Sequence, residues 1–377
     1  SAFAHLTGWA ADSQPDSLLV FAPPDAGHDV TLYFRERADR HTAEFYSNAA
    51  IGEFWIGPRP ALDGVAAELG LATAHIDTFA AGDADLVVDQ DEELTRFVSE
   101  LRLIKDAYEI AQMRLAVDVT ARGFDDIIAE LPKAIAHPRG ERIVEGVFYT
   151  RARADGNEVG YSTIAASGHH ACYLHWTRND GVVAPGDLIL IDAGVEVDSL
   201  YTADITRTLP VSGTFSDVQR KIYETVREAA DAAFAAAKIG VKFRSVHEAA
   251  MEVIAARTAE WGLLPVTAEE ALDADNGGQH RRYMVHGTSH HLGIDVHDCA
   301  QARREMYYDG ELEAGMVFTI EPGLYFQIDD VTVPEEYRGI GARIEDDILM
   351  TADGPVNLSA GIPRTADEVE AWVQRSL

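Results

Sequence analysis

Apolar residues recur at helical spacing in two segments of the chain. The first segment carries such positions at Ile110, Met113, Val117, Phe124, Ile127 and Leu131, so we predict a helix there. Gly123 costs stability within that helix and marks a candidate break. Residues 217–238 are predicted as a second helix, because an apolar stripe lies between Asp217 near its start and Gly240 just past its end. Residues 245–261 are predicted as a third helix.

Strand-like apolar runs alternate with these helices. Two of the runs follow a turn glycine, Gly186 or Gly315, and end in an acid, Asp192 or Glu321. The two glycines are 129 residues apart (315 − 186), and so are the two acids (321 − 192). This pattern predicts two related halves that each deliver an acid to one point near a pseudo-twofold axis. We expect a curved antiparallel sheet backed by helices, which is an α/β (α+β) fold.

A third apolar run, residues 344–350, contains Glu345 within its strand-like stretch. A carboxylate in or beside a buried strand is unfavourable unless another group offsets its charge. Solvated acids on an edge strand would explain one such segment, but the arrangement occurs three times. We therefore infer that a shared pair of metal ions offsets the charge.

Four histidines lie within the twelve positions 286–297, which favours a functional site there. The helical signature of zinc proteases, with two histidines around a glutamate, is absent. An oxygen-rich ligand set suits Mn²⁺, Co²⁺ or Fe²⁺ better than a structural zinc ion. Without metal the acids would repel one another, so metal binding should stabilise the fold. The candidate ligands are four carboxylates and one imidazole: Asp192, Asp204, Glu321, Glu345 and His290.

The composition argues against some classes of function but does not identify one. The 377 residues include 31 Lys plus Arg and 63 Asp plus Glu, which gives a formal net charge of −32. Such a charge argues against binding to nucleic acid or to an anionic membrane surface. The chain has only two cysteines, no apolar run of transmembrane length and no signal-peptide pattern at its start. These features predict a cytoplasmic protein.

Several long motifs occur in an order that resembles one enzyme family. HGTSHHLGIDVHD, TIEPGLYF, GIGARIEDD and ADITRTLP resemble the pita-bread metallopeptidases of family M24, and aminopeptidase P (Xaa-Pro aminopeptidase) most closely. The resemblance covers about residues 101–377 and, more weakly, FAHLTGWAADSQPDSLLVF near the start. It implies a pita-bread catalytic domain over residues 99–377 and a smaller α/β domain over residues 1–98. That first domain looks incomplete at its start.

The resemblance also implies how the metal centre is built. Asp192 would hold one of two divalent ions, and Asp204 and Glu345 would bridge both. His290 and Glu321 would complete the second ion. Mn²⁺ is the expected metal, with Co²⁺, Fe²⁺ or Zn²⁺ as alternatives. A hydroxide between the ions would attack the N-terminal Xaa-Pro bond of a peptide, with Glu321 as the proton shuttle.

Further residues match positions that face the substrate in that family. His175 would lie near the tetrahedral intermediate, and His286 and His297 would face the substrate. Arg343 and Tyr325 would bind the substrate, Arg343 on the proline side. The family resemblance also implies a homo-oligomer, either a dimer or a tetramer, acting on peptides with proline in second position.

Two questions stay open at this point. Asp192 and Asp204 are 12 residues apart (204 − 192), one more than is usual in the family, and either a β-bulge or a longer hairpin loop would absorb the extra residue. The alternatives in function are a prolidase restricted to Xaa-Pro dipeptides and a pita-bread binding protein without catalysis. Binding proteins of that kind typically lack metal ligands, whereas all five candidate ligands are present in this chain.

Overall fold

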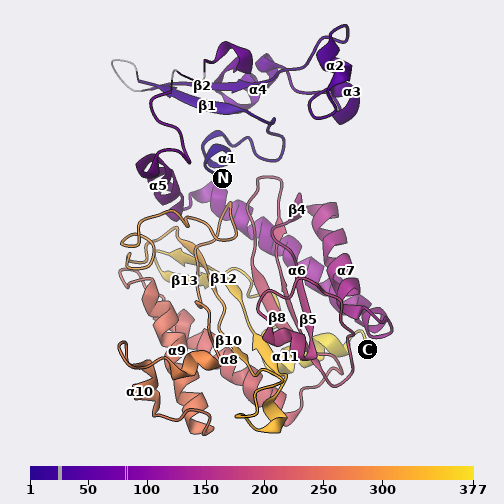
Figure 1. Ribbon diagram of the computed structural model, residues 1–377, viewed down its shortest axis with the longest axis vertical. Helices are drawn as coiled ribbons and strands as arrows, with labels where there is room; N and C mark the ends of the chain where they lie inside the picture. Colours follow the sequence, from indigo (N-terminus) through magenta and orange to yellow (C-terminus); the bar gives the residue numbers. More distant parts are fainter. Residues whose placement is uncertain (24–27, 81, 83) are drawn as a thin grey trace. The chain divides into compact units, whose positions relative to one another are not determined.

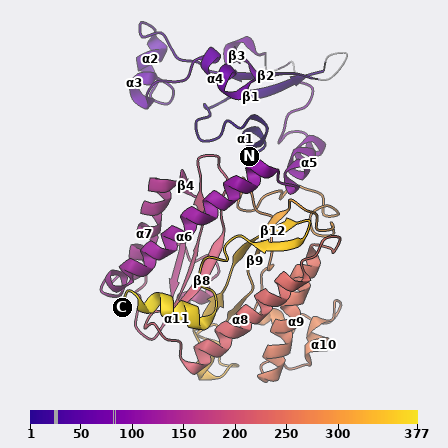
Figure 2. The ribbon, with the colours of Figure 1, turned by 180° about the vertical axis from the view of Figure 1, so that it is seen from behind.

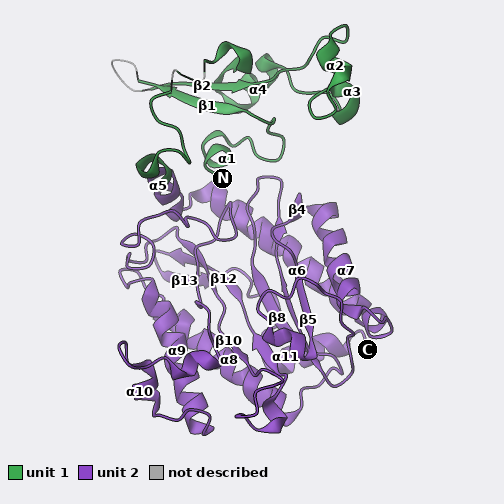
Figure 3. Cartoon of the chain, in the orientation of Figure 1, with its two compact units in different colours: residues 1–95 green, residues 96–377 purple. Residues whose placement is uncertain are grey.

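The computed structural model describes residues 1–23, 28–80, 82 and 84–377. The chain divides into two compact units, residues 1–95 and 96–377, which are coloured separately in Figure 3 and by sequence in Figure 1. Among the described residues, no helix is both long and apolar enough to span a bilayer.

The first unit is a small α/β structure. Its sheet has the order β1-β2-β3, with β1 antiparallel and β3 parallel to the central strand. Trp9, Leu32, Phe34 and Val65 form its core. The elements are α1 (Ala2–Thr7), β1 (Leu18–Ala22), β2 (Asp29–Phe34), α2 (Ala43–Ser47), α3 (Glu53–Ile56), α4 (Leu62–Leu69), β3 (Ala72–His75) and the short η1 (Ile76–Thr78). Helix α5 (Glu92–Glu100) crosses the boundary between the units.

Two pairs of long helices cover one face of the strands in the second unit, as the rear view in Figure 2 shows. α6 (Ala107–Ile135) packs against α7 (Gly140–Asp155), and α8 (Asp217–Ala236) packs against α9 (Arg244–Glu260). Capping boxes start α6 at Asp106 and α8 at Ser216. The three predicted helices are therefore confirmed as α6, α8 and α9. The remaining helices of this unit are α10 (Ala268–Leu272), α11 (Ala366–Gln374), η3 (Leu101–Leu103), η4 (Gly168–Cys172), η5 (Gln279–Arg282) and η6 (Glu335–Tyr337).

The candidate break at Gly123 is wrong, because α6 continues through it. A Cβ atom at Gly123 would lie 2.6 Å from the Phe148 ring of α7. Glycine at this position therefore allows the two helices to approach each other closely, and packing offsets its low helix propensity.

The strands of the second unit form antiparallel pairs. One sheet has the order β5-β6-β8, and the corresponding sheet of the other half has the order β13-β12-β9. Two shorter pairs, β4 with β7 and β10 with β11, complete the layer. The bounds are β4 (Glu158–Val159), β5 (Ile164–Ser167), β6 (Leu188–Ala193), β7 (Val195–Glu196), β8 (Ile205–Pro210), β9 (Val317–Ile320), β10 (Gly323–Tyr325), β11 (Gly341–Arg343), β12 (Asp346–Thr351) and β13 (Gly354–Asn357).

The two halves repeat the predicted pattern of turn, buried strand and acid. Gly186 before β6 has a φ angle of 95°, and Gly315 before β9 has a φ angle of 96°. L-residues with a side chain rarely adopt this backbone region, so both turns require glycine. Every residue of β6 and of β9 is buried. Asp192 lies near the end of β6 and Glu321 directly follows β9, which brings an acid to the same point of each half.

The 12-residue spacing between the two aspartates is absorbed at a hairpin tip. The pairing register is constant from Asp192 opposite Thr206 to Glu196 opposite Thr202, so no bulge lies between the aspartates. The loop consists of residues 198–200, and Leu200 has a φ angle of 68°. This is the usual geometry of a three-residue hairpin loop, whose last residue is left-handed.

Candidate metal centre and active-site cavity

A cavity of about 870 Å³ opens in the second unit. That size falls within the usual range of ligand sites. Nine of the ten predicted site residues line it: His175, Asp192, Asp204, His286, His290, His297, Glu321, Arg343 and Glu345. The tenth, Tyr325, is buried beside the cavity, where its hydroxyl contacts both His286 and Arg343.

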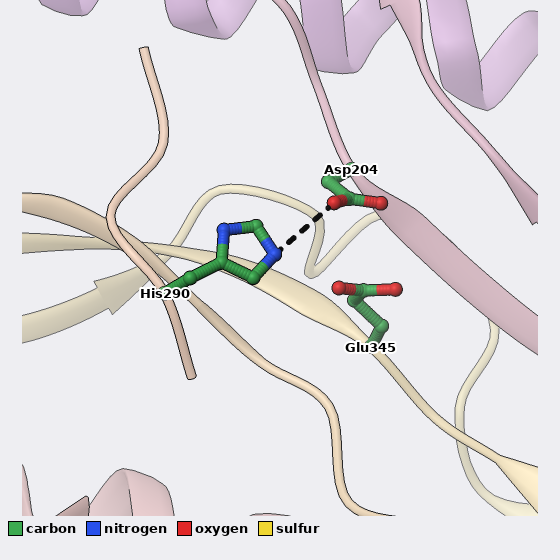
Figure 4. Close-up of side chains that lie close together, drawn as sticks. All are labelled: Asp204, His290 and Glu345. Carbon is green, nitrogen blue, oxygen red and sulfur yellow. Dashed lines mark ion pairs between the residues drawn. The ribbon is translucent and has the colours of Figure 1, made fainter. Parts of the chain in front are cut away.

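Asp204, His290 and Glu345 converge from three different parts of the chain, as Figure 4 shows. Asp204 immediately precedes β8, and Glu345 lies between β11 and β12. One ligand atom from each of the three residues lies within 4.8 Å of the others. His290 Nε2 is 3.4 Å from Asp204 Oδ2. Two carboxylates and an imidazole at this spacing could hold a divalent cation.

The other two candidate ligands lie at the edges of this group. Glu321 Oε1 is 3.5 Å from His290 Nε2. Asp192 Oδ2 accepts a hydrogen bond from Arg343 Nη2 at 2.5 Å, and Asp192 Oδ1 accepts one from the Tyr161 hydroxyl at 2.7 Å. Asp192 is therefore engaged by side chains, and the compact group of possible ligands contains Asp204, His290 and Glu345 but neither Asp192 nor Glu321.

The carboxylates of the site carry more negative charge than their surroundings offset. Burial raises the pKa of Glu321 to about 7. Burial also raises the pKa of Glu345 well above its usual value, and the neighbouring carboxylates of Asp204 and Glu321 raise it further. For His290, burial alone would lower the pKa, but the carboxylates of Asp204 and Glu321 raise it to about 9. The cluster thus favours protons or other cations.

The predicted substrate-facing residues form a connected group beside the cluster. His286 Nε2 lies 2.7 Å from the Tyr325 hydroxyl, which also accepts a hydrogen bond from Arg343 Nη1 at 3.1 Å. Burial lowers the pKa of His286 to about 3 and also lowers the pKa of His297. The His297 ring lies 4.4 Å from the His290 ring, measured between centroids. His286 and His297 are therefore neutral near pH 7. His297 can donate an N–H to a substrate oxygen, whereas both ring nitrogens of His286 already contact protein oxygens, the Gly287 carbonyl and the Tyr325 hydroxyl.

Two residues at this site were missed by sequence reasoning. The Tyr161 hydroxyl lies 2.7 Å from Asp192 Oδ1 and 2.5 Å from Asp204 Oδ1, so it joins the two aspartates. Asp347 is fully buried, and its carboxylate accepts the backbone N–H of Asp204 at 3.2 Å. No sequence pattern pointed to Tyr161. The period of two along a strand could have identified Asp347, because it places residue 347 on the same face as Glu345.

Comparisons with known proteins give consistent matches over the whole chain. Residues 111–352 match metallopeptidase family M24. The chain is 50% identical to Xaa-Pro aminopeptidase 1 of Streptomyces coelicolor, over 98% of this chain and 78% of that protein. The structure of Pseudomonas aeruginosa aminopeptidase PepP has a TM-score of 0.83 at 31% identity and covers 100% of this chain and 89% of that one. An Escherichia coli aminopeptidase P variant in complex with substrate has a TM-score of 0.82 at 29% identity, with the same coverage.

Proposed function

Because the chain belongs to metallopeptidase family M24, we propose that it releases the N-terminal residue from peptides whose second residue is proline. The family and the pita-bread α/β fold predicted from the motifs are confirmed by the family match and by the similar solved structures. The chain is a metal-dependent aminopeptidase. Its preference for an Xaa-Pro bond, the number and identity of its metal ions and the roles of its residues are parts of the proposal.

The observation that supports the proposal most directly is the excess of buried carboxylates among the residues that line the cavity. Four carboxylates meet there, with Arg343 and His290 as their nearby cations. A metal-bound His290 is neutral, and two divalent ions then carry as many positive charges as the four carboxylates carry negative ones. The oxygen-rich ligand set suits Mn²⁺ first, with Co²⁺, Fe²⁺ or Zn²⁺ as alternatives. The residues that would hold the ions are Asp192, Asp204, His290, Glu321 and Glu345. Arg343 neutralises Asp192 in the metal-free chain, so metal must compete with this guanidinium for one carboxylate.

Bound divalent ions supply Lewis acidity, which polarises a carbonyl group and makes water a stronger acid. Glu321 would take the proton from the attacking water and pass it to the leaving nitrogen, a task for which a pKa of about 7 is well placed. The neutral imidazole of His297 would donate an N–H to the substrate, and His286 would face the substrate beside it. His175 would lie near the developing oxyanion.

The side chains of this site suit a peptide bond that precedes proline. The proline nitrogen carries no hydrogen, so a protease that must bind the backbone N–H at that position cannot hold it. Here the charged groups and imidazoles that line the cavity are carboxylates, histidines and the guanidinium groups of Arg304 and Arg343, and they can act on the carbonyl and on a free α-amine.

The prolidase alternative receives less support from the cavity. A dipeptidase needs a cation that binds the C-terminal carboxylate of Xaa-Pro. Arg343 is the cation assigned to the proline side, but it is only 3% exposed and already contacts Asp192, Thr206 and Tyr325. The engagement of Arg343 favours a substrate that continues past the proline. Arg304, the other arginine of the cavity lining, is exposed and is not assigned to the proline side. A binding protein without catalysis is disfavoured because all five candidate ligands face the cavity or its edge.

Product analysis by mass spectrometry after Mn²⁺ loading tests the function directly. The substrates are an Xaa-Pro-Xaa tripeptide, an Xaa-Pro dipeptide and an Xaa-Ala-Xaa tripeptide, and the control enzyme is Glu321→Gln. The proposal expects release of the first residue from the Xaa-Pro-Xaa tripeptide only. Cleavage restricted to the dipeptide would make the chain a prolidase, and no cleavage of any substrate would support the binding-protein alternative.

Three further parts of the proposal concern the whole chain. We keep residues 1–98 and 99–377 as the proposed domains. A homo-oligomer, dimer or tetramer, is tested by light scattering, and a monomer would contradict it. A cytoplasmic location is supported by Cys172 and Cys299, which are both buried and unpaired, and fractionation of cells would test it.

A further inference from the structure

One buried carboxylate, that of Glu141, binds four donors from a single segment of the chain. Glu141 lies in the first turn of α7 and has no exposed surface. Its Oε1 atom accepts the backbone N–H of Ser167 at 2.8 Å and lies 2.7 Å from Nδ1 of His170. Its Oε2 atom accepts the indole N–H of Trp176 at 2.9 Å and the backbone N–H of Gly181 at 2.7 Å. Two donors on each oxygen use the carboxylate fully.

The four donors belong to residues 167–181, and this segment forms one wall of the active-site cavity. Leu174, His175 and Thr177 line the cavity, and all three lie between His170 and Gly181 in the chain. Within the described residues, the His175 imidazole has no hydrogen-bond partner of its own. Its position therefore depends on the backbone and on the neighbouring side chains that Glu141 holds.

The packing around the carboxylate leaves little freedom. The His170 and Trp176 rings are stacked, with centroids 3.9 Å apart. A Cβ atom at Gly181 would lie 2.8 Å from Cδ of Glu141 and 2.7 Å from the His170 ring, so glycine is needed for this close approach. The backbone N–H of Glu141 also bonds to the Gly181 carbonyl at 3.2 Å. The two ends of the segment are thus tied to the same point of α7.

We propose that Glu141 is a positioning residue for catalysis, which acts by holding His175 at the cavity. This inference rests on the proposed function. Glu141 is not among the residues that line the cavity or that could hold the metal ions. Its effect on the reaction must therefore pass through the segment, and through His175 in particular, since that side chain is the one assigned to the reacting carbonyl.

The principal test is a double-mutant cycle between Glu141→Gln and His175→Ala in the Mn²⁺-loaded enzyme. A glutamine keeps the shape but offers one acceptor oxygen, so two of the four donors lose their partner. We expect Glu141→Gln to lower kcat by about 10- to 100-fold, because small displacements of a catalytic group have effects of this size. KM and the Mn²⁺ dissociation constant should change little. In the His175→Ala background the same substitution should have no further effect on kcat.

Hydrogen–deuterium exchange of the metal-free protein gives a reading that does not depend on activity. Glu141→Gln should speed exchange in peptides covering residues 167–181 and leave those from α6 unchanged. Faster exchange throughout the second unit would indicate a general loss of stability and would overturn the inference.

A matched pair of tryptophan substitutions covers the case in which Glu141→Gln does not fold. Trp176→Phe removes the indole N–H that bonds to Glu141. Trp372→Phe removes an indole N–H of α11 that bonds to Asp125 of α6 at 2.8 Å. We expect only Trp176→Phe to lower kcat, and that effect should also vanish in the His175→Ala background. Unchanged kcat in Trp176→Phe and Glu141→Gln, or losses that multiply with that of His175→Ala, would overturn the inference. Failure of the unmutated enzyme to cleave would instead refute the proposed function.

Discussion

Glu345 and Asp346 are adjacent in the chain and equally buried, yet their environments shift their acidity in opposite directions. Burial and neighbouring carboxylates raise the pKa of Glu345, which faces the cavity. Asp346 points away from it. Burial alone would raise the pKa of Asp346, but the guanidinium groups of Arg207 and Arg364 lower it. These two cations lie 2.7 and 2.9 Å from its carboxylate oxygens.

The difference separates acids that stabilise the fold from acids that await a ligand. Arg207 has no exposed surface, and besides its ion pair it donates to the backbone carbonyls of Thr206 and Glu345 at 2.9 and 2.7 Å. It therefore ties the strand that follows Asp204 to the strand that follows Glu345. The charge behind the sheet is balanced within the protein, whereas the charge on the cavity side is balanced only when cations bind.

The largest expected effect is a loss of turnover when an acid on the cavity side of the sheet is replaced. Glu321→Gln should lower turnover of an Xaa-Pro-Xaa peptide by about a thousandfold, which is typical for loss of a group that transfers protons. Circular dichroism should show an unchanged fold. The matched control is Glu305→Gln, which alters an exposed acid outside the cavity lining. Near-normal turnover of the Glu321→Gln enzyme with metal bound would exclude the shuttle role.

Removing an acid from the balanced side should instead damage the fold. Asp346→Asn leaves the buried Arg207 without its counter-ion, so we expect a loss of about 3–5 kcal/mol in the free energy of unfolding. Asp347→Asn, one position along, is the control. Burial raises the pKa of Asp347 well above its usual value, so an uncharged amide should cost little there. Equal losses from the two substitutions, measured by urea unfolding, would contradict the comparison.

In the metal-free protein, the excess of negative charge at the cavity should make the free energy of unfolding depend on pH. Glu321 has a pKa of about 7 in the folded chain against an ordinary value of 4.5, so the folded state retains a proton that the unfolded state has released. Its contribution is present below pH 4.5 and is lost as the pH rises to about 7. Relative to Glu321→Gln, the metal-free enzyme should lose about 3 kcal/mol over this range. Urea unfolding of both proteins in chelator at pH 5 and pH 8 measures this, and a difference independent of pH would refute it.

Metal should reverse this loss, and the gain counted per bound ion is the smallest of these effects. At a free Mn²⁺ concentration 100 times the dissociation constant, the folded state should gain about 2.7 kcal/mol for each ion bound. The melting temperature should rise accordingly and fall again on chelation, together with activity. Asp204→Asn provides the control, because loss of a ligand should remove most of the gain. A melting temperature indifferent to chelator would contradict a metal site.

Sequence reasoning reached the candidate ligands Asp192 and Glu321 because buried strands that end in acids leave a local signal, and the family resemblance supplied the proposed ligand roles. Sequence reasoning also placed the helices, since their apolar stripes and caps are local as well. It failed at Gly123, where the neighbouring helix makes glycine acceptable, and at Tyr161, whose partners Asp192 and Asp204 are 31 and 43 residues away. For the spacing of those aspartates it left two alternatives, and strand pairing selected the hairpin loop.

The chain by itself determined the family, the repeated halves and which residues could meet at the cavity, because these depend on patterns within short segments. Only the tertiary structure decided which buried acids have an internal counter-ion. By residue type alone Glu345, Asp346 and Asp347 look equivalent, and only the family resemblance singled out Glu345. Alternate residues of a strand face opposite sides of a sheet. The cations that distinguish them, Arg207 and Arg364, come from distant parts of the chain. The charge balance of a buried site is set by such contacts, and no local pattern encodes them.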